Sequence, residues 1–173
     1  MSLSMYQASI PVFVKQLTNL SVILKKGEEY AIAKKIEPEV FINARLFPDM
    51  FPLSRQVQIA TDGVKGCAAR LASVEVPSYP DTEKTFADLQ ARIAKTIDFV
   101  KSFSATQIDG SEERKVTLKL RDKEAVFLGQ SYLLNFVLPN LYFHVTTTYA
   151  ILRHNGVDIG KRDYIGKLPE LPS

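Results

Sequence analysis

The hydrophobic residues of this chain recur mainly at helical spacing, and four segments place an apolar residue at every third or fourth position. The predicted helices run from about Met5 to Lys26, about Leu53 to Val74, roughly Glu83 to Phe103, and about Ser131 to Asn155. The apolar stripe of the second helix includes Cys67, which is therefore expected to be a small buried side chain rather than a nucleophile. Four amphipathic helices predict an all-α four-helix bundle.

Between the third and fourth predicted helices the hydrophobic period changes to two. Residues 115–128, KVTLKLRDKEAVFL, alternate and predict two short strands that turn at Arg121 and Asp122. A turn of two residues pairs Val116 with Phe127, Leu118 with Ala125, and Lys119 with Glu124. Because an isolated hairpin is marginal in water, it is expected to pack on a helix or on a partner.

Prolines and polar residues mark the connections between the helices. A proline-containing loop, INARLFPDMFP, precedes the second helix, and the linker PSYPDTEKTF precedes the third, with Asp81 or Thr82 as the expected N-cap. Pro139 lies within the fourth helix or divides it. No internal repeat or second boundary interrupts the chain, so residues 1–173 are predicted to form a single domain.

Composition narrows the class of protein further. Hydrophobic residues make up 46% and charged residues 24% of the 173 residues, which is the balance of a soluble globular domain. A net charge of +3 is too weak to predict nucleic-acid binding. No apolar run approaches the roughly 20 residues of a membrane span, and no signal peptide is recognisable. A single cysteine fits a reducing compartment, so a cytoplasmic location is expected.

Both histidines lie on the fourth predicted helix, ten residues apart. At about 1.5 Å and 100° per residue, His144 and His154 are about 15 Å apart along the helix axis and point about 80° apart. They cannot share a metal ion on a straight helix, and the histidine and cysteine counts exclude a His₃ or Cys/His zinc site. His154 is expected to be exposed. His144 flanks the apolar stripe, which fits either a buried hydrogen-bonded histidine or a member of a ligand pocket.

Three polar residues of the second predicted helix are candidates to face His144. Gln56 lies close to the apolar stripe, so its amide needs a buried partner. Gln58 and Asp62 are four residues apart on a flank that idealised helix angles place mostly in solvent. Sites in helix bundles are nevertheless built from inward polar groups of facing helices. A glutamine and aspartate group that met His144 would form a modest polar pocket.

Four motifs in this order resemble a bacterial family of unknown function within the DinB/YfiT-like four-helix-bundle superfamily. They are SMYQASIPVF, MFPLSRQVQIATD, VEVPSYPDTEKTFADLQARI and FHVTTTYAILRHNGVDIGKRDYIG. The resemblance covers the whole chain. It implies a DinB-like bundle with a small hairpin between the third and fourth helices, and a dimer formed by helix packing.

The resemblance also implies a place where a metal site would lie. Many DinB-like proteins bind a divalent metal through one histidine on the second helix and two on the last, and some act in thiol transfer. His144 matches one ligand of the last helix, but Thr148 stands four residues on, where its partner would be. Gln56 or Gln58 stands where the histidine of the second helix is expected. Two of the three ligands are therefore missing.

We accordingly expect a cytoplasmic homodimer that binds a small molecule or a protein partner in a polar pocket between the second and fourth helices, without a cofactor, nucleic acid or membrane. The candidate pocket residues are Gln56, Gln58, Asp62, His144 and Thr148. One alternative is a metal-dependent enzyme, of thiol-transfer or hydrolase type, that holds a divalent metal with His144, Asp62 and a glutamine carbonyl. Another is a structural or interaction module. The sequence leaves open whether the protein is an enzyme.

Overall fold

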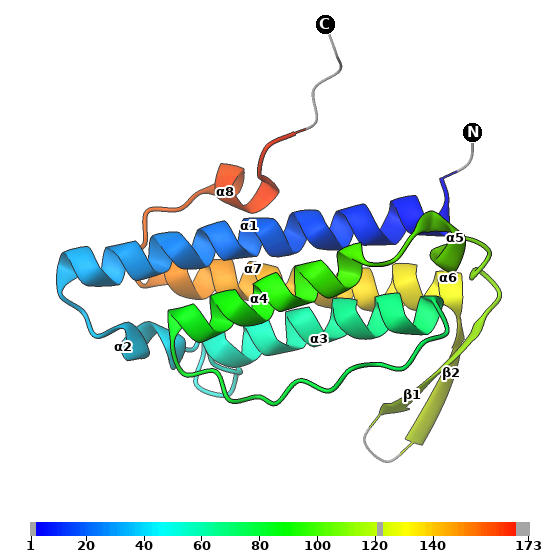
Figure 1. Ribbon diagram of the computed structural model, residues 1–173. Helices are drawn as coiled ribbons and strands as arrows, with labels where there is room; N and C mark the ends of the chain where they lie inside the picture. The colour runs from blue at the N-terminus through cyan, green and yellow to red at the C-terminus, as the bar shows by residue number, and fades with distance from the viewer. Residues whose placement is uncertain (1–2, 121–122, 169–173) are drawn as a thin grey trace, which may run out of the picture.

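Four long helices form the body of the computed structural model, which describes residues 3–120 and 123–168 (Figure 1). They are α1 (Met5–Lys34), α3 (Leu53–Leu71), α4 (Phe86–Lys101) and α7 (Leu138–His154). α1 packs on α4, and α3 packs on both α4 and α7. The apolar stripes meet in one core, in which Cys67 is fully buried. The predicted four-helix bundle is confirmed.

The first helix is longer than predicted. It continues past Lys26 to Lys34, and it ends where Lys35 adopts a left-handed conformation with φ of 56°. The extension is held by packing, because Gly27 and Ala31 are buried. A Cβ atom at Gly27 would lie 3.0 Å from the Leu152 side chain, so the absence of a side chain lets α1 and α7 approach closely. A short helix, α2 (Pro38–Ile42), follows before the loop at residues 43–52.

The third helix begins later than predicted, after a long linker. Residues 72–85 run back along the bundle from the end of α3 to the start of α4, so these two helices point in the same direction (Figure 1). The expected N-cap at Asp81 or Thr82 is wrong. Thr85 is the N-cap, and its hydroxyl accepts from Asp88 N while the Asp88 carboxylate accepts from Thr85 N. Asp81 instead forms ion pairs within the bundle.

The hairpin has the predicted register. Strand β1 (Lys115–Leu120) pairs antiparallel with β2 (Lys123–Leu128), which places Val116 opposite Phe127, Leu118 opposite Ala125, and Lys119 opposite Glu124. The predicted turn at Arg121 and Asp122 lies outside the described residues. The hairpin packs on the bundle through an aromatic cluster, since the Phe127 ring lies 6.1 Å from Tyr132 and 6.0 Å from Phe136. A short helix, α5 (Ala105–Ile108), precedes it.

The last long helix begins before Pro139 and changes its hydrogen bonding there. A turn of α-helix, α6 (Gly129–Tyr132), leads into a π-helical turn, η1 (Leu133–Val137), and then into α7. Proline has no N–H to donate to the carbonyl four residues earlier, and the preceding residue Leu138 donates to Leu133 O, five residues back. The wider turn therefore absorbs the proline without ending the helix.

The C-terminal part of the described chain closes over α1. Gly156, just beyond the last helix, has φ of 93°, a conformation that glycine favours after a helix C-terminus, and α8 (Lys161–Ile165) then lies against α1 (Figure 1). Lys26 pairs with Asp163 at 2.6 Å, and Asn19 Nδ2 donates to Tyr164 O at 2.9 Å. These contacts fasten α8 to α1.

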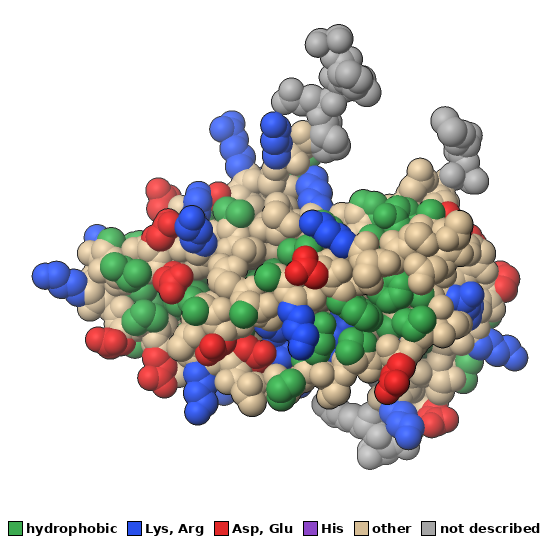
Figure 2. Space-filling model, in the orientation of Figure 1, with side chains coloured by type: hydrophobic (Ala, Val, Ile, Leu, Met, Phe, Trp, Pro, Cys, Tyr) green, Lys and Arg blue, Asp and Glu red, His purple; other side chains and the backbone are tan. Residues whose placement is uncertain are grey.

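Charged side chains of both signs are interspersed over the face drawn in Figure 2, and neither sign forms a continuous patch there. Among the helices of the described residues, none combines the length and the apolar character needed to cross a membrane.

Candidate functional site

His144 and Gln56 meet in the interior between α7 and α3. The Nδ1 atom of His144 lies 2.6 Å from Oε1 of Gln56, and the two side chains are only 7% and 1% exposed. Gln56 belongs to the first turn of α3, and His144 lies near the middle of α7. The buried partner that the sequence requires for Gln56 is therefore supplied by the histidine of the facing helix.

The neighbouring backbone completes this pair. Gln56 Nε2 donates to the carbonyl oxygen of Phe51, at 3.0 Å, in the loop before α3. Thr148 is fully buried, and its hydroxyl donates to the carbonyl oxygen of His144 at 2.9 Å. The threonine thus satisfies its hydroxyl on its own helix, one turn back. His154, by contrast, is exposed at the end of α7, as predicted.

The environment of His144 favours the neutral imidazole. Burial lowers its pKa to about 4, and the positive charge of Arg55 adds to that effect. The side chain is therefore uncharged near pH 7. It contacts the ring of Phe143 edge-on, at 5.2 Å between the ring centres.

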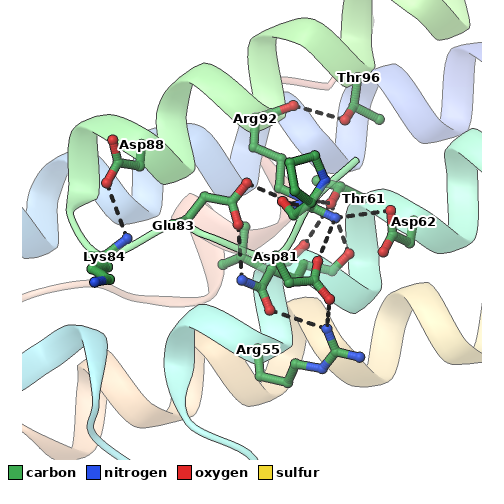
Figure 3. Close-up of polar contacts among 12 residues, drawn as sticks. Arg55, Thr61, Asp62, Asp81, Glu83, Lys84, Asp88, Arg92 and Thr96 are labelled. Carbon is green, nitrogen blue, oxygen red and sulfur yellow. Dashed lines mark hydrogen bonds and ion pairs between the residues drawn. The ribbon is translucent and has the colours of Figure 1, made fainter. Parts of the chain in front are cut away.

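Gln58 and Asp62 lie elsewhere. Asp62 is on the side of α3 that faces α4 and the linker (Figure 3), and Gln58 contacts Glu83 of that linker. Gln58 Nε2 donates to Glu83 Oε2 at 2.9 Å, and its Oε1 accepts from Arg55 at 3.2 Å. The expectation that this flank is mostly solvated fails for Gln58, which is 5% exposed, because the linker covers it. The five candidate residues are thus divided into two groups on different sides of α3.

Arg92 organises the second group. Its side chain is 2% exposed, and its guanidinium contacts Asp62 at 2.9 Å, Asp81 at 3.1 Å and Glu83 at 2.9 Å. The Nε atom also donates to the hydroxyl of Thr61 at 2.8 Å. Burial by itself lowers the pKa of Arg92, but the hydrogen bond to Glu83 and the three carboxylates outweigh burial and raise it above its ordinary value.

We call this second group the Arg92 cluster. Its members are Arg55, Gln58, Thr61, Asp62, Lys65, Asp81, Glu83 and Arg92. Arg55 pairs with Asp81, and Lys65 pairs with Asp62 at 2.7 Å. Three positive and three negative side chains therefore neutralise one another, and the cluster fixes the linker to α3 and α4. Sequence reasoning missed Arg92, although its place between Leu89 and Thr96 on the inward face was a usable signal.

A cavity of about 310 Å³ adjoins the Arg92 cluster rather than His144. Its lining includes Tyr79, Glu83, Arg92 and Lys95. The ammonium groups of Lys65 and Lys95 lie over the Tyr79 ring, at 3.8 and 4.2 Å from its centre, which is the geometry of cation–π contacts. Both acidic oxygens of Glu83 are already hydrogen-bonded.

The residues around His144 do not fit the three-histidine metal site of DinB-like proteins. The Gln56 oxygen is bonded to Nδ1 of His144, and the hydroxyl of Thr148 donates to a backbone carbonyl. Within residues 3–120 and 123–168, no three or more histidine, cysteine or acidic side chains are grouped so that they could hold an ion. Asp62 is engaged by Lys65 and Arg92, so it does not join His144 as the alternative site required.

The crystal structure of a DinB family member protein from Shewanella denitrificans resembles this chain with a TM-score of 0.88 and 38% sequence identity, over 97% of this chain and 95% of that one. The comparison with curated proteins gives no match. A family model described as Domain of unknown function (DUF1993) matches residues 5–165. The chain therefore belongs to the DUF1993 family, a family of unknown function with the DinB-like four-helix fold.

Proposed function

We propose that this protein binds a small molecule or a protein partner at the site formed by His144 and Gln56 between α3 and α7, without a metal cofactor. One observation carries the proposal. His144 is buried and held by Gln56 through Nδ1, yet its other ring nitrogen, Nε2, has no hydrogen-bond partner among the described residues. A ring nitrogen without a protein partner, on a side chain that is otherwise buried and held in place, is free to bind an external group.

Two exposed aromatic residues belong to the segments that hold His144 and Gln56. Phe143, next to His144, and Phe51, whose carbonyl binds Gln56, are each 55% exposed. Aromatic side chains left in solvent around a single polar group are typical of recognition surfaces, because they supply contact area while the polar group fixes orientation. The pair and its two aromatic neighbours form what we call the His144 site.

The proposal is tested by titrating isotope-labelled protein with indole as the probe and recording NMR spectra. We expect shifts at His144, Gln56 and Phe143, and we expect them to vanish in His144→Ala while remaining in His154→Ala, which removes the exposed histidine. Shifts that avoid the His144 site would contradict the proposal. Metal analysis of untagged protein is the second arm, since a tightly held stoichiometric divalent metal would favour the enzyme alternative instead.

We further propose that the protein is a cytoplasmic homodimer. Apolar side chains in solvent favour association, and Phe47, Val126 and Leu128 are 64%, 63% and 43% exposed. The buried, unpaired Cys67 is consistent with a reducing compartment. Light scattering should give twice the chain mass of 19.4 kDa, and a mass near 19.4 kDa would refute the dimer. Cell fractionation tests the location.

A further inference from the structure

The orientation of the Gln56 amide is fixed by the loop before α3. Its Nε2 donates to the backbone carbonyl of Phe51 at 3.0 Å. A carbonyl oxygen only accepts, so turning the amide over would set two oxygen atoms against each other. The Oε1 atom of Gln56 must therefore be the one that faces His144.

The fixed amide in turn determines where His144 carries its proton. An amide oxygen only accepts, so Nδ1, at 2.6 Å from Oε1, must donate. A neutral imidazole that is protonated at Nδ1 has a lone pair at Nε2. The low pKa of His144, about 4, keeps this form dominant at neutral pH. Gln56 therefore selects one tautomer of the ring.

The lone pair of Nε2 is accessible. The atom has no hydrogen-bond partner among the described residues, and it does not belong to the fully enclosed polar atoms that lack a partner. It must therefore reach the surface. Phe143 contacts the same imidazole edge-on.

We infer that the His144 site recognises a neutral hydrogen-bond donor on an aromatic ring, such as a phenolic O–H or an indole N–H, with Nε2 of His144 as the acceptor. This inference rests on the proposed function. An acceptor group such as a carbonyl would face the lone pair and be repelled. A cationic donor is opposed by the guanidinium of Arg55, whose charge acts on His144. The aromatic body of the ligand matches the exposed ring of Phe143, which contacts the His144 imidazole.

Matched pairs of probes isolate the hydrogen bond. Phenol and anisole share a ring, but only phenol donates, and indole and 1-methylindole form a second such pair. NMR titration should show each donor binding about tenfold more tightly than its methylated analogue, as one net hydrogen bond predicts. Equal affinities within both pairs would overturn the inference.

Gln56→Glu should reverse the preference. A carboxylate at this position stabilises the imidazolium form, in which Nε2 carries a proton and donates. The variant should then bind acetophenone, an acceptor, more tightly than phenol. Gln130→Glu makes the same charge change at an exposed position and should leave the preference of the natural chain intact. A Gln56→Glu protein that still favours phenol contradicts the assigned tautomer.

The tautomer can also be read without any probe or variant. Long-range ¹H–¹⁵N spectra at pH 7 should show His144 with a protonated Nδ1 and an unprotonated Nε2, with exposed His154 as the internal reference. A proton on Nε2 overturns the inference. Its failure is distinguishable from that of the proposed function, because equal binding of phenol and anisole at His144 would retain the site and remove only the acceptor role.

Discussion

The His144 site and the Arg92 cluster lie on two sides of the same helix, α3, and both bury polar groups, but they differ in how completely those groups are paired. In the Arg92 cluster three basic and three acidic side chains face one another. In the His144 site two uncharged side chains share one hydrogen bond, and Nε2 of the histidine is left over. A closed network stabilises a fold, whereas an open one has a group to offer to another molecule.

The more highly charged of the two groups is not the one that we propose to bind a ligand. The Arg92 cluster has the charges, the adjoining cavity and the cation–π contacts that usually suggest a site. Its ionic groups nevertheless bind each other, and they hold the linker at residues 72–85 against two helices. We therefore assign the cluster a structural role.

The largest effect is expected from Arg92→Met. Removing the guanidinium leaves Asp62, Asp81 and Glu83 close together without their shared partner. Breaking a buried ionic network in this way costs about 3–5 kcal/mol. Urea unfolding should show a loss of that size, while binding of indole at the His144 site stays unchanged under conditions in which the variant is folded.

Lys95→Met is the matched control, because it removes a positive charge from an exposed position on the same helix. Its effect should be no more than about 1 kcal/mol, the size of the exposed cation–π contact with Tyr79 that it removes. If Arg92→Met loses no more unfolding free energy than Lys95→Met, the Arg92 cluster does not hold the linker. The mutual pairing of its charged side chains would then not be what stabilises the fold.

The second prediction concerns pH and the His144 site. The pKa of His144 is about 4 in the folded protein and about 6.5 in an unfolded chain. Between these values the unfolded state binds more protons, so stability falls as the pH falls from 6.5 to 4. The shift corresponds to about 3 kcal/mol, present in full above pH 6.5 and lost below pH 4.

The contribution of His144 is obtained by measuring unfolding free energies of the natural chain and of His144→Asn across this pH range. The difference between the two should change by about 3 kcal/mol, with the natural chain losing more stability on acidification. His154→Asn, which replaces the exposed histidine of the same helix, is the control. A His144→Asn protein whose acid sensitivity equals that of the natural chain would show that the imidazole is not held neutral by burial.

The sequence predicted most of the fold because helical spacing and strand alternation are local properties. The apolar stripe that contains Cys67 predicted α3, and the alternation of residues 115–128 predicted the hairpin and its register. The end of α1 was placed too early, at about Lys26, because the polar residues that follow hide the buried Gly27 and Ala31. The π-helical turn before Pro139 was not predicted, because a proline indicates that regular helical hydrogen bonding is interrupted but not which local structure replaces it.

The candidate site was predicted only in part. The angular positions of the residues on their helices placed Gln56 beside the core and His144 at its edge. These positions predicted that the two side chains could meet between the helices, as they do. They could not show that the linker folds back over α3 and covers Gln58 with Glu83. The position of a residue relative to the apolar stripe of its helix does not predict which residues of a loop will cover it. For that reason Gln58 and Asp62 were assigned to the wrong partner.

The third prediction tests the hydrogen bond between Gln56 and His144 by a double-mutant cycle. Gln56→Leu leaves a buried N–H of His144 without an acceptor, and His144→Leu leaves the Gln56 oxygen without a donor. Each should cost about 1–3 kcal/mol. The double variant should be about 1–2 kcal/mol more stable than the sum predicts, since neither member of the pair is then left without its partner. Additive losses would mean that the two side chains do not stabilise each other.

The smallest effect is expected from Thr148→Val, which distinguishes a site residue from a helix residue. The hydroxyl donates to His144 O, and valine keeps the branched shape while losing that bond. Because a helix carbonyl still accepts from the backbone N–H four residues on, the loss should be no more than about 1 kcal/mol. Phenol affinity should not change. A variant that folds normally but loses the preference for phenol over anisole would place Thr148 in the His144 site after all, and would show that the contrast with the Arg92 cluster depends on more than one open atom.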